Sequence, residues 1–215
     1  MTETVPENFP VIDYYYALIS PWTYLGGPRL EHIARRHGVG IAYKPIDLAQ
    51  VLPHTGGVPL AKRAPARQAY RLTELERWRA YLGVPLNLHP AHFPVPEWPA
   101  AGMVIAMARA EGALGEDPGA LSNAILRAVW AEERDISDTG TLLAIAAEQG
   151  LDGPALLAAG ADLKAVWDAN SAEAVARGVF GVPTYVWNDS LYWGQDRLDF
   201  LDQTLEADLE DTLGM

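Results

Sequence analysis

The feature that most constrains the fold is a change of hydrophobic period, because β-type runs lie near both ends of the chain and a helical block separates them. Residues 11–19 are an apolar, aromatic run, and residues 41–46 form a second run. Ser20 and Pro21 open the segment between them, since a serine cap followed by proline is typical of a helix start. This part of the chain therefore predicts a β-α-β unit with a right-handed crossover.

The middle of the chain is expected to be a loop over residues 47–65 and helical beyond it. Apolar residues recur there at helical spacing, and alanine, the strongest helix former, is frequent. A proline-rich, irregular stretch over residues 86–99 interrupts the pattern. The expected helices span residues 66–82, 100–114, 118–134, 138–149, 153–158 and 161–178.

The period changes back near the end of the chain. Residues 182–187 and 191–193 are short β-type runs around a hairpin turn at Asn188-Asp189-Ser190, and residues 195–209 form a closing helix. The order β-α-β, helical block, β-β-α predicts an α/β, thioredoxin-like fold with a large all-helical insertion.

The same order predicts the domain organisation. We expect the thioredoxin-like domain to comprise residues 10–65 and 179–212. The helical insertion subdomain is expected to comprise residues 66–178.

The chain contains no cysteine, and this count limits its chemistry. It excludes disulfides, cysteine nucleophiles, iron–sulfur clusters and cysteine-based zinc sites. Any thiol chemistry must therefore use a thiol from outside the chain. The five histidines show no metal-binding spacing, so no metal site is expected.

Charge and hydropathy limit the partners. The net charge is −12 and no basic cluster is present, which argues against nucleic acids and anionic membranes as partners. No apolar run reaches the ~18 residues of a membrane helix. Residues 1–10 lack the basic start and apolar run of a signal peptide, so a cytoplasmic location is expected.

Ser20 is the first candidate site residue. A helix N-terminus offers free N–H groups and a partial positive charge, which suit an anion such as a thiolate. Ser20 also follows a strand end in an α/β unit, where ligands bind, and Trp22 and Tyr24 lie near enough to wall a pocket. Ser20 either only caps the helix or also donates a hydrogen bond to a ligand. No histidine or acid stands at a spacing that would activate it as a nucleophile.

Two later segments are further candidates. Proline before a β-type run indicates an edge strand or a cis peptide bond, and a cis Val182-Pro183 bond would leave the backbone of Val182 free to pair with an extended peptide. A simple proline at a strand start is the alternative. Gln195 and Asp196, after Gly194, either complement a helix dipole or hold the charged groups of an amino-acid-like ligand.

These segments belong to a longer series of motifs that occur in order along the chain. The motifs are Ser20-Pro21 with Tyr24-Leu25, Ile46-Asp47-Leu48-Ala49, Leu75-Glu76-Arg77-Trp78 with Tyr81 and Gly83-Val84-Pro85, Ala128-Val129-Trp130, Phe180-Gly181-Val182-Pro183-Thr184, and Trp193-Gly194-Gln195-Asp196-Arg197-Leu198. In this order they resemble the 2-hydroxychromene-2-carboxylate isomerases, relatives of the kappa-class glutathione transferases, from about Val11 to Leu205. The resemblance implies a thioredoxin-like fold with a helical insertion, a homodimer, and glutathione as cofactor.

The resemblance also implies roles for site residues. Ser20 matches the serine that contacts the glutathione sulfur. Val182 and Pro183 match the turn whose backbone pairs with the cysteinyl part of glutathione. Asp196, with Gln195 beside it, matches the acid that holds the γ-glutamyl end.

The chain departs from the family pattern at three positions. Gly57 stands where the family often has an asparagine that helps to hold glutathione or substrate. Arg67 matches a family lysine if one residue is inserted, and it keeps the charge with a different geometry. Ala17 stands where an acid is frequent before the serine.

Contacts with a small aromatic substrate are less specific. Lys62 and Arg67 are candidates to bind a substrate carboxylate, with solvent-exposed loop charges as the alternative. Trp22, Phe93 and Trp98 are candidates to line an aromatic pocket, with core packing as the alternative.

For activity, the resemblance implies glutathione-dependent isomerisation of 2-hydroxychromene-2-carboxylate-type substrates to trans-o-hydroxybenzylidenepyruvate. Glutathione thiolate adds reversibly, the former double bond rotates, and elimination gives the trans product, with Ser20 donating a hydrogen bond to the thiolate. One alternative is a kappa-class-like transferase or peroxidase that consumes glutathione. A second is a non-catalytic, thioredoxin-like binding module.

Overall fold

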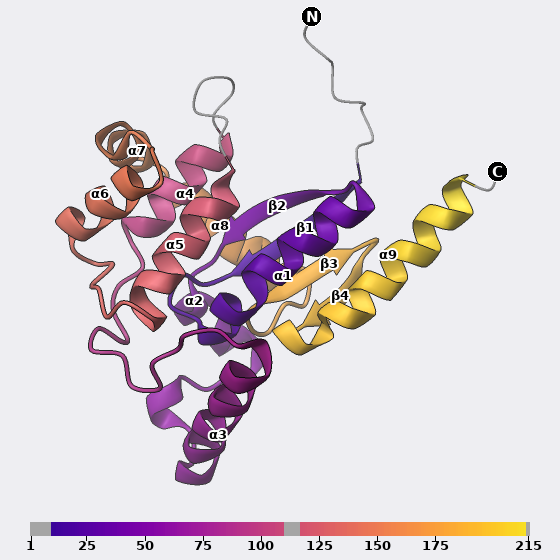
Figure 1. Ribbon diagram of the computed structural model, residues 1–215, viewed down its shortest axis with the longest axis horizontal. Helices are drawn as coiled ribbons and strands as arrows, with labels where there is room; N and C mark the ends of the chain where they lie inside the picture. Colours follow the sequence, from indigo (N-terminus) through magenta and orange to yellow (C-terminus); the bar gives the residue numbers. More distant parts are fainter. Residues whose placement is uncertain (1–9, 110–116, 214–215) are drawn as a thin grey trace, which may run out of the picture.

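The computed structural model describes residues 10–109 and 117–213. Within this part of the chain, one mixed sheet has the strand order β2-β1-β3-β4 (Figure 1). Its strands are β1 (Val11–Tyr16), β2 (Gly40–Pro45), β3 (Thr184–Trp187) and β4 (Ser190–Trp193). Strand β1 pairs in parallel with β2 and antiparallel with β3, and β3 pairs antiparallel with β4. The expected α/β order is confirmed.

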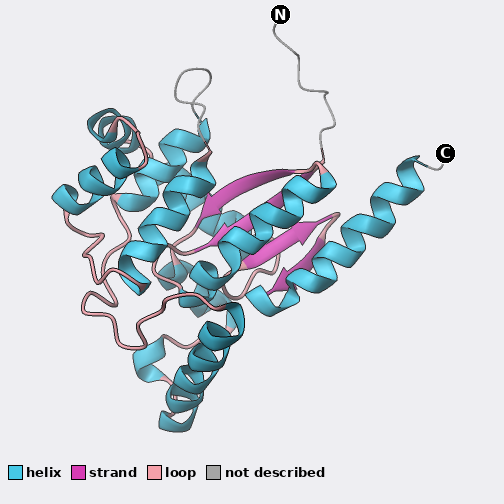
Figure 2. Cartoon of the chain, viewed as in Figure 1, coloured by secondary structure: helices cyan, strands magenta, loops and turns pink. Residues whose placement is uncertain are grey.

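Most of the helices lie between β2 and β3 in the chain (Figure 2). The helices in the described part of the chain are α1 (Pro21–His37), α2 (Leu48–Thr55), α3 (Pro65–Leu82), α4 (Ala100–Arg109), α5 (Pro118–Trp130), α6 (Thr139–Glu148), α7 (Gly153–Gly160), α8 (Lys164–Ala176) and α9 (Leu198–Leu213), with 3-10 helices η1 (Leu60–Lys62) and η2 (Gln195–Arg197). The helices expected in the insertion are confirmed to within a few residues, except that residues 110–114 lie outside the described residues. None of the described helices is long and apolar enough to cross a membrane.

The expectation of a loop over residues 47–65 is wrong, because α2 and η1 lie within it. Asp47 caps α2 by accepting a hydrogen bond from the N–H of Ala49, and Gly56 ends the helix with a φ of 73°. The side chain of Val51 is fully buried against the sheet. Capping and burial therefore stabilise a two-turn helix that its own sequence, with an internal proline, does not signal.

Strand β1 separates two cores. Tyr14 and Tyr16 face the larger core, which includes α1, α4, α5 and α9, whereas Tyr15 faces a smaller core with α2 and α8. The Tyr14 ring stacks on Tyr16, with centroids 4.4 Å apart, and on Tyr185 of β3 at 5.3 Å. The tyrosines whose pattern predicts this strand therefore also help to hold neighbouring strands in register.

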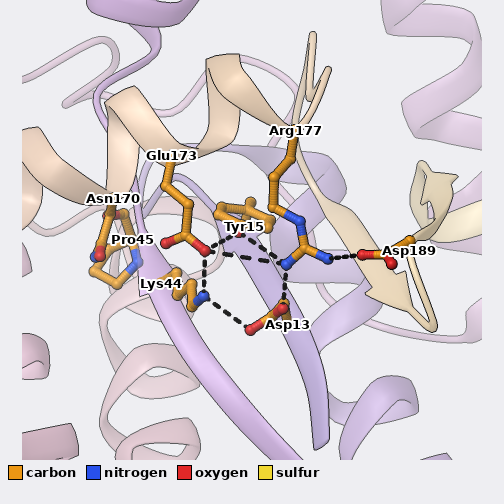
Figure 3. Close-up of polar contacts among 8 residues, drawn as sticks. All are labelled: Asp13, Tyr15, Lys44, Pro45, Asn170, Glu173, Arg177 and Asp189. Atoms are coloured by element: carbon orange, nitrogen blue, oxygen red, sulfur yellow. Dashed lines mark hydrogen bonds and ion pairs between the residues drawn. The ribbon is translucent and has the colours of Figure 1, made fainter.

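On the face covered by α8, an ion-pair network joins that helix to the sheet (Figure 3). Arg177, the residue directly after α8, binds Asp13 of β1, and it binds Asp189 of the β3–β4 turn at 3.1 Å. Lys44 of β2 binds Asp13 at 2.9 Å and Glu173 of α8 at 2.7 Å. The network is partly desolvated, because the Arg177 and Asp13 side chains are only 26% and 25% exposed. It therefore stabilises more than a fully exposed ion pair would.

We predict that Arg177→Met lowers the free energy of unfolding by about 1–2 kcal/mol, measured by urea denaturation. The variant leaves Asp13 and Glu173 with Lys44 as their remaining cationic partner in the network. The matched control is Arg77→Met, which removes the same charge from an exposed pair within one helix and is expected to leave stability nearly unchanged. Equal losses in the two variants would contradict a special role for the network.

Candidate functional site

The turn of residues 17–20, between β1 and α1, presents Ser20 at the start of α1. The N–H of Ser20 donates to the carbonyl of Ala17 at 3.1 Å, and Ser20 Oγ accepts from the N–H of Thr23 at 3.3 Å. The predicted capping role is therefore confirmed. The hydroxyl proton of Ser20 has no acceptor among the described residues. Because a hydroxyl accepts and donates at once, Ser20 caps α1 and still keeps a donor for a ligand.

A backbone segment with free polar groups lies beside this turn. The Val182-Pro183 peptide bond is cis, one of the two conformations that the sequence allowed. Because β3 runs antiparallel to β1, the residues just before β3 run alongside the turn after β1, and Ala17 and Val182 pack in the same core. Within the described chain, the N–H and C=O of Val182 have no hydrogen-bond partner, so they are available to an extended ligand.

Residues 194–197 follow β4 and form a third segment of the site. They are bonded to the Val182-Pro183 segment, because the N–H of Gly194 donates to the carbonyl of Pro183 at 2.8 Å. Gln195 is 1% exposed, and its side-chain and backbone oxygens accept from Arg29 of α1 at 2.7 and 3.0 Å. Its side-chain oxygen therefore already joins η2 to α1. Asp196 is exposed and pairs with the neighbouring Arg197, so its carboxylate is accessible to a ligand.

The structure shows no contact between the residues around Ser20 and the other polar candidates, which lie after α2, in η1 and in α3. Gly57 follows the end of α2 and donates to the carbonyl of Leu52 at 3.0 Å. Lys62 ends η1 and Arg67 lies in the first turn of α3, and both are exposed. No described contact joins either cation to Ser20, so their contacts with cofactor or substrate stay predictions.

The aromatic candidates all pack on the larger core while remaining partly exposed. Trp22 lies in the first turn of α1. The Phe93 ring lies 4.9 Å from that of Trp130, and the Trp98 ring lies 5.7 Å from that of Trp167. Core packing, the alternative reading, is therefore present for each of them.

A cavity of about 440 Å³ runs along α1 beyond this group. Its wall includes Tyr24 and Arg29, which follow Ser20 by four and nine residues along the chain. Its lining residues are Tyr24, Leu25, Pro28, Arg29, Leu82, Val84, Ala120, Asn123, Ala124, Arg127 and Gln149. None of the predicted catalytic or cofactor-binding residues lines it, so the hydrogen-bonding geometry around Ser20 is the better guide to the chemistry.

Glu97 lies behind the Ser20 turn and is not among the site residues expected from the sequence. The residue precedes α4, and its carboxylate accepts a hydrogen bond from the N–H of Leu18. The N–H of Ile19 also bonds this carboxylate. Glu97 as a whole residue is half-buried, and its carboxyl group is bonded to the backbone of the turn and has no cationic partner among the described residues.

The environment of Glu97 changes its acidity. Burial is the main cause that raises its pKa to about 8; the two backbone N–H groups oppose this change, and the charge of Asp47 adds a smaller increase. A carboxyl group that exchanges a proton near neutral pH therefore lies behind the turn that carries Ser20. A lone glutamate in a proline-rich stretch carries no sequence signal of this position.

Comparison with known proteins identifies the fold family of this chain. Residues 11–206 match the DsbA-like thioredoxin domain family. The chain is 33% identical to a 2-hydroxychromene-2-carboxylate isomerase of Sphingobium xenophagum over 198 residues, which cover 90% of this chain and 97% of that protein.

Two solved structures are similar. One is a 2-hydroxychromene-2-carboxylate isomerase, with a TM-score of 0.75 and 27% identity, covering 95% of this chain and 98% of that one. The other is the cytosolic disulfide reductase DsbM from Pseudomonas aeruginosa with GSH, with a TM-score of 0.65 and 22% identity, covering 95% and 100%. At 22% identity, the similarity to DsbM shows a common fold and nothing more. The expected thioredoxin-like fold is thus confirmed.

We predict a pH dependence of stability that comes from Glu97. Its pKa rises from about 4.5 to about 8 on folding, so its contribution to stability is complete below about 4.5 and is lost as pH rises through about 8. Glu97→Gln is expected to remove a slope of up to about 1.4 kcal/mol per pH unit in that window. Urea denaturation between about pH 5 and about pH 9 measures the slope.

The matched control is Glu206→Gln on the exposed face of α9. It is expected to keep the wild-type pH profile, because that side chain is not enclosed. The same slope in Glu97→Gln as in the wild type would rule out the assignment.

Proposed function

Because this chain belongs to the 2-hydroxychromene-2-carboxylate isomerases within the DsbA-like thioredoxin family, it is an isomerase, and we propose that it uses glutathione to convert 2-hydroxychromene-2-carboxylate-type substrates to trans-o-hydroxybenzylidenepyruvate. One observation carries the glutathione dependence. In a chain without cysteine, the free hydroxyl donor of Ser20 lies at a helix N-terminus beside the unpaired backbone of Val182. The homodimer and the cytoplasmic location remain predictions.

The donors and acceptors of the site fit glutathione. The N–H and C=O of Val182 suit the backbone of its cysteinyl residue, as in strand addition. The exposed carboxylate of Asp196, joined to that segment through Gly194 and Pro183, suits its γ-glutamyl ammonium group. The DsbM structure was solved with GSH, which supports glutathione binding by this fold.

The chain itself stabilises negative charge at Ser20. Glutathione, when bound, supplies the reversible sulfur nucleophile that cis–trans isomerisation of a conjugated acid requires. Ser20 Oγ donates its free proton toward that position. The N–H of Trp22, which has no partner in the described chain, and the positive end of α1 add to the same field. These groups lower the pKa of a thiol held there, as the N-terminus of a helix does for cysteine.

We predict that the purified protein converts a hydroxychromene carboxylate only when glutathione is present, and that the thiol is not consumed. Product absorbance and thiol titration measure the two quantities in one reaction. Loss of one thiol per turnover would instead support the kappa-class-like transferase. Absence of glutathione binding in calorimetry at millimolar concentration would support the binding module.

We further predict that Ser20→Ala lowers kcat on the order of 10- to 100-fold, because a donor to the thiolate is lost. Loss of the cap also lowers stability by about 1 kcal/mol, so thermal unfolding is recorded in parallel. Ser190→Ala in the exposed edge strand β4 is the matched control, with unchanged turnover. Full turnover by a folded Ser20→Ala variant would remove the proposed role.

A further inference from the structure

Arg71 of α3 is a partly buried cation without an anionic partner. Its guanidinium carbon lies 5.6 Å from the centroid of the Phe93 ring and 5.7 Å from that of Trp130. Within residues 10–109 and 117–213, no carboxylate or carbonyl bonds it. Other arginines of the same helix are paired, Arg77 with Glu74 at 2.6 Å and Arg79 with the carbonyl of Leu86 at 3.1 Å. Arg67 also lacks a partner in the described chain but is exposed, so Arg71 is the arginine of α3 that is both partly buried and without an anionic partner.

This environment is unfavourable for a cation until an anion arrives. Burial, together with the smaller effect of the nearby charge of Arg63, lowers the pKa of Arg71 to about 10. The two aromatic rings attract the positive charge, but they provide no oxygen acceptor for the N–H donors of the guanidinium group. Those donors form a rigid fork that matches the two oxygens of a carboxylate.

Arg71 is connected to the Ser20 turn through one side chain. The fully buried Trp130 contacts the guanidinium with its ring, and its Nε1–H donates to the carbonyl of Ile19 at 3.2 Å. Ile19 directly precedes Ser20. Helix α3 also packs against α1, which begins at this turn (Figure 1). Arg71 and the turn that carries Ser20 therefore contact the same buried side chain, Trp130.

We propose that Arg71 is the residue that binds the carboxylate of the aromatic substrate, with Phe93 and Trp130 holding its guanidinium plane in place. The proposal rests on the proposed function and names the substrate-binding residue of that site. Arg71 takes the role that sequence analysis assigned to Lys62 and Arg67, because it is ordered by two rings whereas those side chains are exposed without described contacts. Less side-chain freedom is lost when such an arginine binds.

The test compares Arg71→Met and Arg71→Lys with Arg77→Met, a control on the same helix with the same loss of charge. Each is assayed with the hydroxychromene carboxylate and with its methyl ester, and thermal unfolding confirms that each is folded. Arg71→Met is expected to raise KM for the acid on the order of 10- to 100-fold and to leave KM for the ester unchanged. Arg71→Lys is expected to recover part of the loss, since it keeps the charge without the fork.

A second readout does not depend on turnover. Calorimetry measures binding of the product acid, and separately of glutathione, to the wild type and to Arg71→Met. Weaker binding of the acid with unchanged glutathione affinity supports the proposal. Weaker glutathione binding alone would overturn it and assign Arg71 to the glycyl carboxylate of glutathione.

The remaining outcomes are also decisive. An equal rise in KM for acid and ester would show that Arg71 only packs on the aromatic rings, and would overturn the proposal. Absence of turnover by the wild type would count against the proposed function alone, because binding of the product acid still tests Arg71.

Discussion

Strand β1 is the constraint on which the rest of the structure depends, because both of its edges and both of its faces are occupied. It is hydrogen-bonded to β2 on one edge and to β3 on the other, and its tyrosines alternate between two cores. The point at which the strand ends is therefore fixed. Ser20 stands four residues beyond Tyr16, and the pairing with β3 brings Val182 alongside the same turn. The register of one strand pair thus sets the geometry of the site.

The two parts of the chain contribute different chemistry to this site. The strands and the helix next to them supply neutral hydrogen-bonding groups, the hydroxyl of Ser20 and the free backbone of Val182. The helical insertion supplies ionisable groups, the enclosed carboxyl of Glu97 and the unpaired guanidinium of Arg71. Glu97 bonds the residue after Ala17, so a carboxylate from the insertion reaches the turn where the family pattern has an acid in the sequence itself. The ionisable group nearest to this turn therefore comes from the helical insertion and not from β1.

Much of this arrangement could be predicted from local patterns. Capping by Ser20, the order of strands and helices, and the possibility of a cis Val182-Pro183 bond all follow from a few adjacent residues. Helix α2 was missed because it depends on burial of Val51 against another part of the chain. Glu97 and Arg71 were missed for the same reason, since their roles come from enclosure and from contacts with sequence-distant groups, which no spacing reveals.

The order of the strands along the chain also has a consequence for biosynthesis. The partner of β1 on one edge, β3, is translated only after the entire helical insertion. Until then, β1 presents unpaired N–H and C=O groups between aromatic side chains, which is a template for pairing with other chains. A nascent chain of this kind is exposed to aggregation for as long as the insertion is being made. The length of the insertion therefore sets how long this edge of β1 waits for its partner strand during synthesis.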